Sequence, residues 1–117
     1  MLKPKELFYM LSDETRLRCL LLLQAKGKCC VCDFIYTLQK EQSNISRHLA
    51  ILRRSGIVSH ERCGSWIYYY INPNLSIWVL NLLSAVAKET ADLYLIDLTR
   101  FDKRDRTLCT TKCDSSL

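Results

Sequence analysis

Apolar residues recur at helical spacing along the first half of the chain. Three of them at i, i+1 and i+4 predict a short amphipathic helix over residues 3–11. A leucine-dense run predicts a second helix over residues 15–25, and a helix that is apolar nearly all round belongs at the centre of a core. Shorter apolar stripes predict a third helix over residues 30–39 and a fourth over residues 43–54.

The fourth predicted helix has two different faces. Ile45, Leu49 and Leu52 recur at i, i+4 and i+7 and should face the core. The opposite face is small, polar and basic. Two short helices joined by a tight turn, the second with such an exposed face, are typical of a helix-turn-helix whose second helix reads DNA.

The pattern then changes from helical to alternating. Residues 57–63 and 66–71 are two β-rich runs separated by Gly64 and Ser65, which predicts a β-hairpin. A hairpin directly after a recognition helix is the wing of a winged helix. The sequence therefore predicts a mainly α fold with a small β-hairpin, a winged helix-turn-helix.

A last helix is predicted over residues 75–90, with an extension to about residue 100. Its apolar stripe is wide enough to bury against a second subunit as well as its own core. We expect residues 1–100 to form one domain for DNA binding and dimerisation. Residues 101–117 are polar and charged, and we expect them to form a flexible tail that contains Cys109 and Cys113.

Composition supports an ordinary globular domain. The 117 residues are 49% hydrophobic and 25% charged, and the net charge is +5. The N-terminus has no apolar leader, and no apolar run is long enough to span a bilayer, so we expect a cytoplasmic protein with no membrane partner. A reducing compartment favours metal or redox chemistry for the seven cysteines over disulfides.

The basic charge lies on the predicted DNA-binding unit. Residues 40–70 hold five Lys or Arg against two acids, whereas positive and negative charges balance from residue 91 onward. Arginine pairs with guanine or phosphate, asparagine pairs with adenine, and hydroxyls donate to phosphates. We therefore expect double-stranded DNA to be the partner. The predicted contacts are Ser43, Asn44, Ser46, Arg47, His48, Arg53, Arg54 and Arg62.

Three of the seven cysteines fall within four positions, at Cys29, Cys30 and Cys32. They lie at the predicted start of the third helix, where the helix dipole and two nearby lysines favour thiolate. Three thiolates without histidine or carboxylate suit a thiophilic ion of trigonal preference, such as arsenite or antimonite, with lead also possible. A redox switch is the alternative. Cys19, in the leucine-rich helix, is expected to be a core residue.

Four segments of the sequence resemble the ArsR/SmtB family of metal-sensing repressors. They are LSDETRL (11–17), CVCD (30–33), SNISRHL (43–49) and WIYYYINP (66–73), and the similarity covers about residues 4–88. The resemblance implies a homodimeric winged helix that represses an operon and leaves DNA when metal binds. We place the dimer interface on the first and last predicted helices, at Leu7, Phe8, Leu11, Trp78 and Leu82.

The CVCD box is similar to that of the arsenic-responsive members, in which both cysteines bind As(III). Those members often carry a third cysteine three residues later, where this chain has Ile35. Cys29 is the expected substitute, with a tail cysteine as the fallback. The N-terminal cysteines of cadmium- and lead-responsive relatives and the helical histidines of zinc-responsive ones have no counterpart here.

We therefore expect a repressor of an arsenic-resistance operon that is released by As(III) or Sb(III), with no enzymatic activity and no catalytic cofactor. A redox-sensing repressor and a cadmium- or lead-responsive one are the alternatives. A further alternative is a metal-buffering or protein-interaction module whose winged helix no longer reads DNA.

Overall fold

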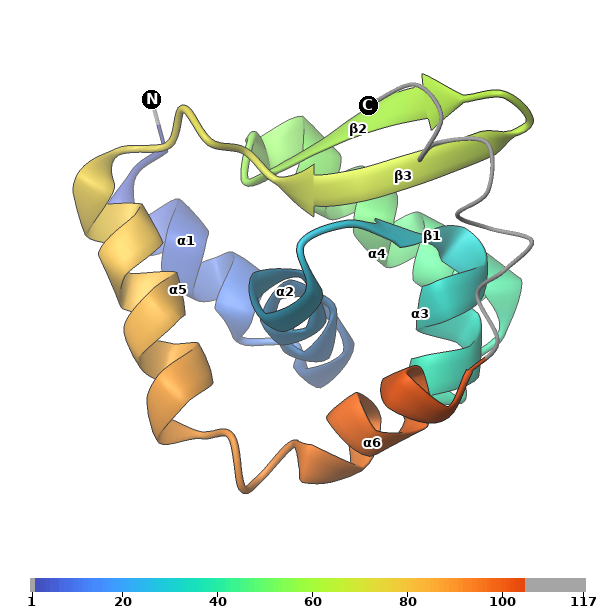
Figure 1. The fold of residues 1–117 in the computed structure, drawn as a ribbon. Coiled ribbons are helices and arrows are strands. Elements are labelled where there is room, and N and C mark those ends of the chain that lie inside the picture. Colours follow the sequence, from blue (N-terminus) through green and yellow to red (C-terminus); the bar gives the residue numbers. More distant parts are fainter. Residues whose placement is uncertain (1, 105–117) are drawn as a thin grey trace.

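The computed structural model describes residues 2–104, which form six helices and three short strands. In Figure 1 the sheet lies at the top, α6 lies at the bottom, and α2 lies between them. The order of elements is α1 (Pro4–Leu11), α2 (Glu14–Lys26), β1 (Cys29–Cys30), α3 (Val31–Leu38), α4 (Gln42–Ser55), β2 (Val58–Cys63), β3 (Trp66–Ile71), α5 (Ile77–Glu89) and α6 (Leu95–Lys103). The predicted mainly α fold with a wing is confirmed.

Local sequence explains where the central helices begin and end. The Asp13 side chain accepts the main-chain N–H of Arg16 at 3.1 Å and so caps the start of α2. Between α3 and α4, Gln39 adopts the left-handed conformation, with φ of 58°. Gly56 ends α4 with φ of 89°, a conformation in which glycine has no steric penalty.

The sheet has a third strand that the sequence pattern did not predict. β1 pairs antiparallel with β3, with Cys29 opposite Tyr69 and Cys30 opposite Tyr68, and β2 pairs with the other edge of β3. β1 therefore attaches the start of α3 to the wing. Two residues are too few to show the alternation that marks a strand.

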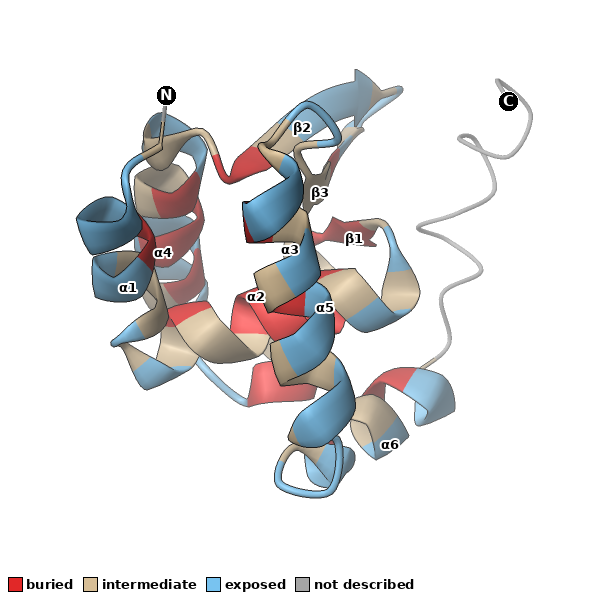
Figure 2. Cartoon of the chain, turned by 90° about the vertical axis from the view of Figure 1, so that its left-hand side faces the viewer, coloured by how far each residue is buried: buried red, intermediate tan, exposed pale blue. Residues whose placement is uncertain are grey.

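The hydrophobic core surrounds α2. Leu20, Leu22 and Leu23 are at most 1% exposed, and they pack in one cluster with buried residues of every other helix. Figure 2 shows the buried residues of α4 along the side of that helix that faces the rest of the bundle. Cys19 lies in this core with no exposed surface, as predicted.

The C-terminal end of the domain differs from the prediction. The chain leaves the helical path after α5 and forms a separate helix, α6, beside α2 and α3 (Figure 1). Arg18 binds both carboxylate oxygens of Asp97, at 2.9 and 2.7 Å, and Phe101 is buried. α6 continues beyond the expected boundary at residue 100 and ends at Lys103. In the described part of the chain no helix is long and apolar enough to cross a bilayer.

Candidate functional site

The fold presents the polar face of α4 to solvent. Ile45, Leu49 and Leu52 have no exposed surface and anchor the helix in the core. The predicted contact residues Ser43, Ser46, Arg47, Arg53 and Arg54 are exposed, and Asn44 is half-buried. The structure thus leaves one face of α4 open to a duplex.

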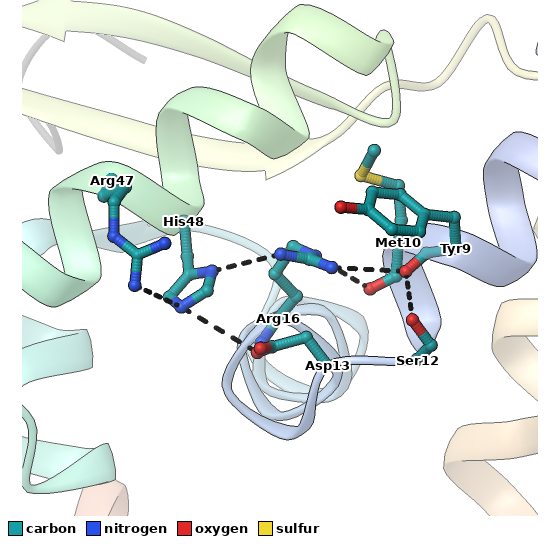
Figure 3. Close-up of polar contacts among 7 residues, drawn as sticks. All are labelled: Tyr9, Met10, Ser12, Asp13, Arg16, Arg47 and His48. Atoms are coloured by element: carbon teal, nitrogen blue, oxygen red, sulfur yellow. Dashed lines mark hydrogen bonds and ion pairs between the residues drawn. The ribbon is translucent and has the colours of Figure 1, made fainter.

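His48 is a correction to the predicted set of DNA contacts. Its side chain is only 3% exposed, and its ring lies between α4 and the start of α2. The guanidinium of Arg16 lies 3.4 Å from His48 Nδ1 (Figure 3). Burial lowers the pKa of His48, and the nearby Arg47 and Arg16 act in the same direction against Asp13. His48 therefore supports the recognition helix from inside, and its side chain does not lie on the exposed face of α4.

The wing lies next to the recognition helix and carries its own polar groups. Arg62 is exposed near the hairpin turn, and its Nε donates to the carbonyl of Gly64 at 3.3 Å. Arg53 of α4 lies 3.3 Å from His60 Nε2 on β2, and the His60 ring stacks on Tyr69 with centroids 5.8 Å apart. These contacts connect the wing to α4, so a displaced wing would also disturb this helix.

Cys30 and Cys32 lie at the start of α3, the first helix of the helix-turn-helix. Cys30 is the N-cap, and its main-chain N–H donates to Oδ2 of the buried Asp33 at 2.9 Å. Cys32 is half-buried in the first turn. Both cysteines line one surface pocket, together with Val31, Ile35, Gln42, Ser65, Trp66 and Ile67. The structure thus brings together two of the predicted ligands, with Ile35 in the same pocket.

Cys29 belongs to a different environment. It has no exposed surface and packs in the main core with Phe34, whereas Cys30 packs with Tyr68 in a separate cluster. Successive residues of a strand point to opposite faces, which explains the separation. Within residues 2–104, no three His, Cys, Asp or Glu side chains are placed to hold a metal ion. Cys109 and Cys113 lie outside the described residues.

Two further residues lie near this site. Cys63, on β2, packs against the cluster of Cys30 and Tyr68, as Cys32 and Trp66 do. Asp33 binds both the Cys30 N–H and, at 3.3 Å, the guanidinium of Arg104. The Asp33 contact with Cys30 has a sequence signal, because an acid three residues after an N-cap is half of a capping box. The proximity of Cys63 to Cys30 has no such sequence signal, because it depends on the pairing of β1 with β3.

The predicted dimer residues fall into two groups. Phe8 and Trp78 are 56% and 37% exposed, so α1 and α5 present apolar surface. Leu11 and Leu82 are partly buried against the core. Leu7 has no exposed surface because it packs inside its own chain, and it cannot form part of an interface.

The protein-family model described as "Bacterial regulatory protein, arsR family" matches residues 13–60, which contain the helix-turn-helix. An arsenic resistance transcriptional regulator of Pseudomonas putida, ArsR2, is 38% identical over 90% of this chain and 91% of its own. The arsenical resistance operon repressor of Escherichia coli is 43% identical over 70% of each chain. The chain belongs to the ArsR family.

Solved structures of such regulators share the fold. The AntR antimony-specific transcriptional repressor superposes with a TM-score of 0.61 and 27% identity, over 80% of this chain and 86% of that one. HlyU from Vibrio cholerae superposes with a TM-score of 0.60 and 26% identity, over 76% of this chain and 88% of that one. The ArsR-family chain is a DNA-binding transcriptional repressor and not an enzyme.

Proposed function

We propose that this repressor leaves its operator when As(III) or Sb(III) binds Cys30 and Cys32, and that it thereby derepresses arsenic-resistance genes. The observation that carries the proposal is the shared pocket of the two thiols at the start of the helix-turn-helix. The arsenic-resistance regulators among its relatives and the antimony-specific AntR support a metalloid inducer. Soft thiolate ligands suit such an ion.

The third sulfur comes from Cys29 or from the tail cysteines Cys109 and Cys113. Cys29 lies in the core beside β3, so its sulfur reaches the pocket only if β1 separates from β3. Recruitment of Cys29 would therefore detach the wing from the start of α3. Recruitment of Cys109 or Cys113 would not require β1 to separate from β3.

The site lies close enough to the DNA-reading elements to act on them directly. Metalloid binding draws Cys30 and Cys32 together in the first turn of α3, where Asp33 caps the Cys30 N–H. A distorted first turn shifts α3, and α3 packs directly against α4. A coupling free energy of about 1–3 kcal/mol lowers operator affinity about 5- to 150-fold, which is enough for a switch.

The proposal includes a homodimer. Phe8 on α1 and Trp78 on α5 present the apolar surface that a second copy would cover, and a dimer places two recognition helices on two half-sites. The protein acts in the cytoplasm, because its DNA target and a reducing environment for its thiols are both found there.

The test is As(III)-dependent release from DNA under full reduction. A fluorescent duplex, selected by the wild-type protein from a random library, is titrated with protein and then with arsenite, antimonyl tartrate or Cd(II) in excess reductant. We expect release by arsenite and antimonyl ion from the wild type and from Cys19→Ala, a control that removes a core thiol. Cys30→Ser and Cys32→Ser should bind the duplex normally and keep it.

Arsenic absorption spectroscopy on the same variants counts the sulfurs. Three sulfurs in the wild type and two in Cys29→Ser identify Cys29 as the third ligand, whereas two in Cys109→Ser or Cys113→Ser identify the tail. Release that occurs only with oxidant, or with Cd(II) alone, would contradict the metalloid assignment.

A further inference from the structure

A polar cluster joins α1, the start of α2 and the recognition helix. It belongs neither to the thiol pocket nor to the wing. Arg16 is only 6% exposed. Its Nε donates to the carbonyl of Met10 at 3.1 Å, and Nη2 donates to the carbonyl of Tyr9 at 3.2 Å (Figure 3). Its Nη1 lies 3.4 Å from His48 Nδ1. One buried guanidinium thus holds the end of α1 and the middle of α4 together.

The ring of His48 lies between two arginines. Arg16 faces Nδ1, and the Arg47 guanidinium lies 3.4 Å from Nε2. A guanidinium only donates hydrogen bonds, and a neutral imidazole accepts at only one of its two nitrogens. His48 can therefore accept from Arg16 or from Arg47, but not from both.

Burial decides which arginine His48 accepts from. Arg16 is buried and depends on protein acceptors, whereas Arg47 is exposed and can be hydrated. The favoured state has Nδ1 as the acceptor for Arg16 and the proton on Nε2. That proton faces the Asp13 carboxylate, 3.8 Å away. In this tautomer His48 offers no acceptor to Arg47, so the Arg47 guanidinium is available for DNA.

We propose that Arg16 and His48 are positioning residues for DNA binding, which hold the recognition helix against the end of α1 and keep Arg47 available to the duplex. Neither residue touches DNA. The same contacts join α1, which carries the exposed Phe8, to the helix that reads DNA. The proposal concerns the resting repressor and holds whether or not the inducer is a metalloid.

Matched variants at one position separate this role from simple core packing. In His48→Asn the side-chain oxygen takes the place of Nδ1 and can accept from Arg16. In His48→Gln the polar group takes the place of Nε2, next to Arg47. We expect His48→Asn to bind the selected duplex within about threefold of the wild type, and His48→Gln and His48→Leu to bind at least tenfold more weakly. Arg16→Lys should resemble His48→Gln, because one ammonium nitrogen cannot occupy the three separate positions from which Nε, Nη1 and Nη2 of Arg16 reach the two carbonyls and the ring.

Two further readouts test the proposed geometry. The ¹⁵N chemical shifts of the His48 imidazole in the folded wild-type protein should report the Nε2–H tautomer. Duplex affinity should fall on acidification, because the protonated ring repels Arg16, Arg47 and Lys40, and within residues 2–104 Asp13 is the one nearby group that favours the charged ring. His48→Asn should lose this pH dependence. Equal duplex affinities of folded His48→Asn, His48→Gln and His48→Leu, or an Nδ1–H tautomer, would overturn the proposal.

Discussion

The buried carboxylate of Asp33 accepts the main-chain N–H of Cys30 at 2.9 Å, and its other oxygen lies 3.3 Å from Arg104. One side chain therefore connects the candidate thiol site, the cap of α3 and the end of α6.

Asp33→Ala should destabilise the protein by about 2 kcal/mol, because it removes an N-cap partner and leaves the partly buried Arg104 without this carboxylate. Urea unfolding measures the loss. Asp102→Ala is the control, since Asp102 pairs with Lys26 on the surface and is 62% exposed there. Similar small effects of both substitutions would contradict a structural role for Asp33.

The ion pair of Arg18 with Asp97 should hold α6 on the domain. Both side chains are largely buried, at 16% and 8% exposed, and the contact is bidentate. Asp97→Asn leaves the buried Arg18 without a charged partner, so we expect a loss of about 3 kcal/mol in urea unfolding. Hydrogen exchange should show α6 opening while α4 stays protected. If α6 exchanges at the wild-type rate, this ion pair does not hold it.

The sequence predicted most of the DNA-binding unit because its signals are local. Helical spacing located the core face of α4, and alternation around Gly64 and Ser65 located the wing. α6 was missed because residues 90–94, where the helical path breaks, contain neither glycine nor proline. A long-range contact, the binding of Asp97 by Arg18, holds the separate helix α6 against the domain.

The sequence predicted only part of the candidate site, because its local signals are clear and its long-range contacts leave no local signal. The CVCD box identified Cys30 and Cys32, but the opposite orientation of Cys29 depends on a two-residue strand that pairs with distant β3. His48 had an available signal, since it lies three residues after Ile45 and four before Leu52 and so shares their buried face. Its polar side chain nevertheless suggested an exposed DNA contact.

Trp78 should contribute to the dimer. It is a large apolar side chain that is 37% exposed on α5. Trp78→Glu should give a monomer in light scattering at micromolar concentration and should weaken duplex binding by at least tenfold, because one recognition helix replaces two. Ile96→Glu on α6, at a position 65% exposed, is the control and should remain dimeric. A dimeric Trp78→Glu protein would place the interface elsewhere.

The thiols should differ sharply in reactivity. Burial raises the pKa of the Cys19 thiol to about 12, so almost none of it is thiolate at neutral pH. Cys32 is half-buried in the pocket and open to reagents. Iodoacetamide under native conditions, followed by mass spectrometry, should label Cys32 and spare Cys19, and denaturant should abolish the difference. Native labelling of Cys19 at the rate of Cys32 would show that the core around α2 opens readily.

Acid should destabilise the fold through His48. Burial is the main cause of the lowered pKa of His48 in the native state, so between its native and unfolded pKa values the unfolded chain binds more protons. The contribution of His48 to the free energy of unfolding is therefore fully present above the unfolded pKa value of about 6.5 and is lost as the pH falls toward the native pKa value.

Urea midpoints measured across this range should decline more steeply for the wild type than for His48→Asn, which cannot take up the proton. The lowered pKa of Asp13, caused mainly by the hydrogen bond from the main-chain N–H of Arg16, adds its own loss at more acidic pH, in both proteins, because both keep this hydrogen bond. Parallel pH profiles above that acidic range would show that the His48 ring is solvated, contrary to the structure.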